Sequence, residues 1–69
     1  MTVYSMKARF YTRQAWMALG KAREAKFNLA NGTNPFIQEL DRAMVSHHAM
    51  QARMTMHTAI IYRQIEGRL

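Results

Sequence analysis

Apolar side chains recur at intervals of three and four residues along most of this chain, and the alternation typical of a β-strand occurs nowhere. Intervals of three and four residues bring side chains onto one side of a helix. The pattern predicts two α-helices, at about residues 4–30 and about residues 35–66, joined by a turn over residues 31–34. We therefore expect an all-α chain that forms a single domain over residues 1–69.

The turn contains residues suited to ending one helix and starting another. Gly32 stands where a left-handed residue often closes a helix, and Asn34 and Pro35 suit the N-cap and the first position of the next helix. A short turn between two helices of similar length favours an antiparallel arrangement. The sequence therefore predicts a two-helix antiparallel hairpin.

One side of the first predicted helix is rich in alanine. Small side chains let a neighbouring helix approach toward the short end of the usual interaxial distance of about 8–10 Å. We expect this side to pack against the second helix. Its members are Tyr4, Ala8, Tyr11, Ala15, Ala18, Leu19, Ala22, Ala25 and Leu29.

The second predicted helix has two apolar sides. One consists of adjoining rows with heptad spacing, and we expect it to face the first helix. These rows are Leu40, His47, Met54 and Ile61, and Ile37, Met44, Gln51, Thr58 and Ile65. The other side consists of Val45, Ala49, Ala52, Met56, Ala59 and Ile60. Because one companion helix covers only one side, the sequence predicts a homodimer, in its simplest form a four-helix bundle of two hairpins.

Composition and charge narrow the functional classes. The chain is 49% hydrophobic with no cysteine, which indicates a globular protein without disulfides and suits a reducing compartment. The net charge of +6 attracts anionic partners, although such a charge also serves solubility alone. With no apolar run of about 20 residues and no pattern of a signal peptide at its start, the chain is expected in the cytoplasm, without membrane contact.

Large aromatic and arginine side chains gather on the outer side of the first helix. We predict a partner-binding surface formed by Arg9, Arg13, Trp16, Arg23 and Phe27. Tryptophan and arginine are enriched where proteins meet proteins, so binding of another protein is the leading hypothesis. Two alternatives stay open: Trp16 belongs to the dimer interface instead, or the basic residues bind nucleic acid, DNA or structured RNA.

Catalytic and metal-binding patterns give little support to other functions. The four carboxylates are dispersed, and no nucleophile elbow, phosphate loop or dinucleotide motif occurs, so we expect no enzyme and no cofactor. Met44, His47, Met54 and His57 recur at helical spacing and form a soft ligand set suited to Cu(I). Methionine is also an ordinary filler of irregular cores, and we predict no metal site. If His47 or His57 is partly buried, dimer stability depends on pH between 6 and 7.

In size, methionine content, absence of cysteine and two-helix layout around the run from Asn31 to Pro35, the chain resembles small helical proteins from the early regions of temperate, lambdoid-type bacteriophages. This resemblance implies a regulator or inhibitor that binds a component of the host, in the host cytoplasm, and modulates host machinery or the choice between lysis and lysogeny. The helical hairpin dimer also resembles plasmid copy-control proteins of the Rop type, which bind paired RNA loops, although the polar residues that they use have no clear counterpart here.

Overall fold

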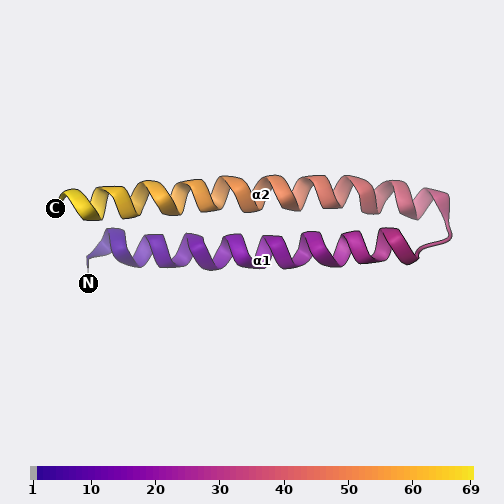
Figure 1. The fold of residues 1–69 in the computed structure, drawn as a ribbon, viewed down its shortest axis with the longest axis horizontal. Helices are drawn as coiled ribbons and strands as arrows, with labels where there is room; N and C mark the ends of the chain where they lie inside the picture. The colour runs from indigo at the N-terminus through magenta and orange to yellow at the C-terminus, as the bar shows by residue number, and fades with distance from the viewer. Residues whose placement is uncertain (1) are drawn as a thin grey trace.

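The computed structural model describes residues 2–69 and contains two helices, α1 (Val3–Asn31) and α2 (Pro35–Arg68). They run antiparallel, side by side along their whole length, with the turn at one end and both termini at the other (Figure 1). The predicted all-α hairpin is confirmed. Within residues 2–69 there is no strand, and neither helix contains a stretch long and apolar enough to cross a membrane.

Local hydrogen bonds set the ends of the helices. The Thr2 hydroxyl accepts from the Ser5 backbone N–H at 3.2 Å, and the Asn34 side-chain oxygen accepts from the Phe36 N–H at 3.0 Å. These bonds satisfy N–H groups that have no partner in the first turn of a helix. The prediction of Asn34 as N-cap and of Pro35 at the start of α2 is therefore confirmed.

Two details of the helix ends differ from expectation. Gly32 is not left-handed: its φ of −78° and ψ of 149° are those of extended backbone, and its N–H donates to the Asn28 carbonyl at 2.8 Å. The backbone therefore leaves the helix in an extended conformation at Gly32, where the turn begins. At the other end α2 continues through Gly67 to Arg68, beyond the predicted end, because an isolated glycine lowers helix stability without breaking the backbone ladder.

The alanine-rich side of α1 packs against α2, as predicted. Five of the six buried residues are its alanines, and the sixth is Ala59 of α2, only 1% exposed. Tyr11, Leu19 and Leu29 on the same side are half-buried. The buried α1 alanines are Ala8, Ala15, Ala18, Ala22 and Ala25. Because no residue larger than alanine is buried among the described residues, the helices meet through methyl groups along one narrow seam.

The side of α2 that faces α1 was predicted wrongly. Seven of the nine positions in the expected heptad rows are exposed, Leu40 by 58% and Met54 by 63%, and only Thr58 and Ile65 are half-buried. The alanine-containing side packs against α1 instead, with Ala59 buried and Ala49 and Ala52 half-buried. Alanine on both helices allows a close approach that the bulkier heptad residues would prevent. Steric fit therefore decides the rotation of α2.

Aromatic stacking joins the two helices near the termini. The Tyr62 ring of α2 stacks with Tyr11 at a centroid distance of 5.7 Å and with Tyr4 at 6.3 Å, and the Lys7 ammonium lies 5.5 Å from the centre of the same ring. The Thr2 hydroxyl donates to the Glu66 carboxylate. These contacts hold together the end of the hairpin that no turn connects.

Candidate interaction face

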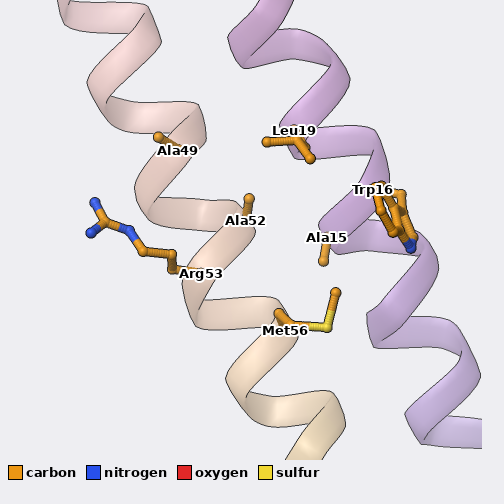
Figure 2. A pocket seen from close by; sticks show the side chains of 7 residues that line it. All are labelled: Ala15, Trp16, Leu19, Ala49, Ala52, Arg53 and Met56. Atoms are coloured by element: carbon orange, nitrogen blue, oxygen red, sulfur yellow. The ribbon is translucent and has the colours of Figure 1, made fainter.

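A shallow apolar groove of about 430 Å³ runs between the helices on one side of the hairpin. Its floor is formed by Ala15 of α1 and Ala52 of α2, with Met56 pointing toward Ala15 from the opposite helix (Figure 2). Trp16 and Arg53 stand at its two edges. The small alanines of the seam create this hollow, because they bring the helix backbones together without filling the surface above them. The full lining is Ala15, Trp16, Leu19, Ala49, Ala52, Arg53 and Met56.

Trp16 lies at the α1 edge of the groove and is 60% exposed. The indole is therefore not buried within the hairpin. An exposed indole gives a large contact area for a partner.

Arginines from both helices border this side of the molecule. Arg9 and Arg23 lie seven residues before and after Trp16, so they share its row on α1. On α2, Arg53 lines the groove, and the Arg63 guanidinium donates across the helix boundary to the Thr12 hydroxyl at 3.3 Å.

Five of the seven arginines lie on this side: Arg9, Arg23, Arg42, Arg53 and Arg63. Glu39 lies on the same row of α2 as Arg53, fourteen residues before it. Among the described residues it is the one carboxylate on the helix rows that carry these five arginines. We call this surface, with Trp16, Leu19 and Met56 at its centre, the Arg–Trp face. Its cations come from two helices, and they converge only because α2 is rotated as described above.

The predicted partner-binding residues divide into two groups. Arg9, Trp16 and Arg23 lie along the Arg–Trp face. Arg13 and Phe27 lie one row further around α1, on the side directed away from α2, where Phe27 is 67% exposed. The structure therefore does not bring these two residues to the groove.

Sequence reasoning missed the contribution of α2 to this face. Arg53 and Met56 of α2 line the groove beside Trp16, as does Leu19 of α1, yet none of the three was a candidate for partner binding. The signal was present in the spacing of Ala49, Ala52 and Ala59 on α2, which matches the alanine spacing of α1. Bringing the two alanine stripes together would have placed Arg53 and Met56 beside Trp16.

A second apolar surface covers the outer side of α2. It consists of the heptad rows that were expected to face α1, and we call it the α2 row: Ile37, Leu40, Met44, His47, Gln51, Met54, Thr58, Ile61 and Ile65. Ile37 is 50% exposed, Leu40 58% and Ile61 42%. None of the nine positions holds a permanently charged side chain. A single hairpin thus leaves one side of α2 uncovered, as anticipated, but on the opposite side from the one expected.

The histidines do not gather with acidic residues. Among residues 2–69 no group of three or more histidine, aspartate or glutamate side chains is placed to hold a metal ion. His47 and His57 are exposed in the single hairpin, so the contact with α1 does not supply the burial on which their predicted pH dependence rests. His48 is the half-buried histidine; its ring meets the His47 ring edge-on at 5.3 Å, and its Nδ1 atom is buried without a hydrogen-bond partner.

No known protein family, curated protein or solved structure matches this chain. Its function is therefore inferred from the geometry of its own surfaces.

Proposed function

We propose that this protein is a non-enzymatic, homodimeric helical regulator that binds a partner protein through the Arg–Trp face. One observation carries the proposal: the exposed Trp16 stands beside an apolar groove that Arg53 of α2 also lines, and Arg9 and Arg23 share the row of Trp16 on α1. The groove and its charges suit an apolar side chain flanked by carboxylates. The partner surface is therefore expected to be acidic.

Physical chemistry favours a protein as the occupant. Trp16 and Met56 offer a large apolar contact over a floor of alanine methyl groups. Tryptophan and arginine contribute most often to binding hot spots, and a surrounding rim of polar contacts keeps water away from them. The arginine fork matches carboxylate geometry with two parallel hydrogen bonds, so it adds orientation as well as attraction.

The biological setting that we propose is the one implied by the resemblance to small phage proteins. In this setting the protein acts by occupying a surface of a host protein. As a dimer it presents two Arg–Trp faces, and two linked contacts raise avidity without any new contact type.

Nucleic acid is the second candidate, favoured by the gathering of five of the seven arginines on one side. Phosphate contacts depend on cations and on salt, and they do not require an indole. A protein partner needs Trp16 for its apolar contact. Substitution of Trp16 therefore separates the two candidates.

The test compares two exposed aromatic residues of α1. Trp16→Ala alters the groove, whereas Phe27→Ala changes a side chain that is equally exposed but directed away from α2. Tagged wild type and both variants are used to capture proteins from nuclease-treated lysate of the source cells, and the captured protein is then purified and titrated. We expect wild type and Phe27→Ala to bind it alike and Trp16→Ala to bind at least tenfold more weakly.

Equal binding by all three proteins would refute the groove as the binding site. A gel shift of DNA or RNA that weakens steeply between 50 and about 200 mM salt and persists in Trp16→Ala would instead establish the nucleic-acid candidate. Circular dichroism of both variants checks that the helices remain intact.

A further inference from the structure

The α2 row has the spacing of a helix-pairing surface. Its members follow one another at intervals of three and four residues from Ile37 to Ile65, which covers most of α2. Apolar residues at this spacing let side chains of two helices interdigitate along a continuous seam. In the single hairpin α1 borders only one edge of this seam: Thr58 and Ile65 are half-buried, and the other seven positions of the row are exposed.

The exposed area of one chain indicates how much surface is left to cover. A compact monomer of 8.1 kDa exposes about 4,500 Å² of solvent-accessible surface, whereas this hairpin exposes 5504 Å². The excess of about 1,000 Å² per chain would give a buried total of about 2,000 Å² for two copies, the lower bound for obligate homodimers.

From the heptad spacing, the absence of permanent charge and the matching area, we propose that a second copy of this chain docks along the α2 row, α2 against α2, with the two helices antiparallel. This inference rests on the homodimer of the proposed function and names the surface that forms it. The Arg–Trp faces stay outside the interface and remain open to a partner. The buried core of the hairpin is made of alanine alone, so the hairpin buries little apolar surface by itself. A protein that covers the α2 row must therefore be present whenever the chain is folded, and a second copy of the chain meets this condition.

The helix dipole favours the antiparallel orientation. Each α2 carries partial positive charge at its N-terminus and partial negative charge at its C-terminus. A parallel pair would place like ends side by side, whereas an antiparallel pair places opposite ends side by side.

In an antiparallel register centred near Ala49, apolar residues of one α2 row meet apolar residues of the other, and the polar centres of the two rows meet each other. In it Ile37 meets Ile61 of the second copy, Met44 meets Met54, and His47 meets Gln51. An imidazole and an amide can hydrogen-bond to each other, and a polar pair inside an apolar seam fixes register.

Cysteine cross-linking tests the orientation directly, since the chain has no cysteine of its own. The variants are Ile37→Cys, Ile61→Cys and the double variant with both changes, each oxidised mildly and examined without reductant. The two positions are 24 residues apart on α2, or about 36 Å, too far for a disulfide within one chain. We expect covalent dimers from the double variant and none from either single variant. A covalent dimer from Ile61→Cys alone would establish a parallel pair and overturn the proposed orientation.

A pair of neighbouring isoleucines tests the surface itself. Ile60 is 44% exposed and Ile61 is 42% exposed in the single hairpin, but only Ile61 belongs to the α2 row. We expect Ile61→Lys to weaken dimerisation at least tenfold in sedimentation equilibrium, and Ile60→Lys to leave the dimer Kd unchanged. Equal effects of the two substitutions, or a folded wild-type species of 8.1 kDa at micromolar concentration, would overturn the proposal.

These measurements use the purified protein without any partner. Failure of the cross-link therefore speaks against the interface, and failure of the capture experiment with Trp16→Ala speaks against the proposed function.

Discussion

Replacing Ala59 by leucine tests the close contact between the helices. Ala59 is 1% exposed, the lowest exposure among the buried residues, and it belongs to the side of α2 that contacts α1. Leucine adds three carbon atoms where the methyl group already fills the space, so the helices must move apart. Overpacking of this kind costs about 1–3 kcal/mol. In a domain of this size each kcal/mol lowers Tm by about 4–8 °C, so we expect a loss of about 4–24 °C.

Ala43→Leu is the matched control. Ala43 lies on the same helix but is exposed, so a leucine there meets no neighbour across the seam. Alanine and leucine are both strong helix formers, and exposed substitutions change stability by about 0.5 kcal/mol or less. Thermal unfolding followed by circular dichroism measures both variants. All samples must have one protein concentration, because the Tm of a dimer depends on concentration.

The result bears on the rotation of α2. If the heptad rows faced α1, Ala59 would lie on the outside and Ala59→Leu would behave like Ala43→Leu. Equal Tm values for the two variants would therefore refute the alanine seam, and with it the convergence of the arginines on the Arg–Trp face.

Three further predictions concern the helix cap, the tyrosine stacks and the half-buried histidine. Asn34→Ala removes the side chain that accepts from the first turn of α2, so we expect a loss of about 0.5–2 kcal/mol in urea unfolding, and an unchanged midpoint would contradict the cap. Tyr62→Leu removes the ring stacks of Tyr62 with Tyr4 and with Tyr11, each of which contributes about 0.5–1.5 kcal/mol. If Tyr4 is already leucine, only the stack with Tyr11 is left to lose, so Tyr62→Leu should then destabilise the protein less. Additive effects of Tyr4→Leu and Tyr62→Leu would argue against the stack between Tyr4 and Tyr62. His48→Leu removes a buried Nδ1 without a hydrogen-bond partner, a defect that costs about 1–3 kcal/mol, so the Tm should rise; a fall would show that the imidazole is stabilising.

The sequence by itself determined the two helices and their turn. Helix periodicity, the cap at Asn34 and the start at Pro35 are local properties, because they depend on residues within a few positions of one another. The alanine side of α1 was equally readable, since that helix has only one stripe of small side chains that extends along its length. The sequence also placed Trp16 and the neighbouring arginines away from this stripe, but it left the exposure of Trp16 open, and the structure shows the side chain to be 60% exposed in the hairpin.

The tertiary structure decided which side of α2 meets α1. Both sides of α2 are apolar, so hydrophobicity did not separate them, and heptad spacing favoured the side with larger residues. Packing between two backbones depends on steric fit, and the stripe of alanines on α1 accepts its closest neighbour where α2 also has alanine. That rotation brings Arg53 and Met56 beside Trp16 and turns Leu40 and Ile61 outward, so both proposed interaction surfaces follow from a fit that neither helix specifies alone.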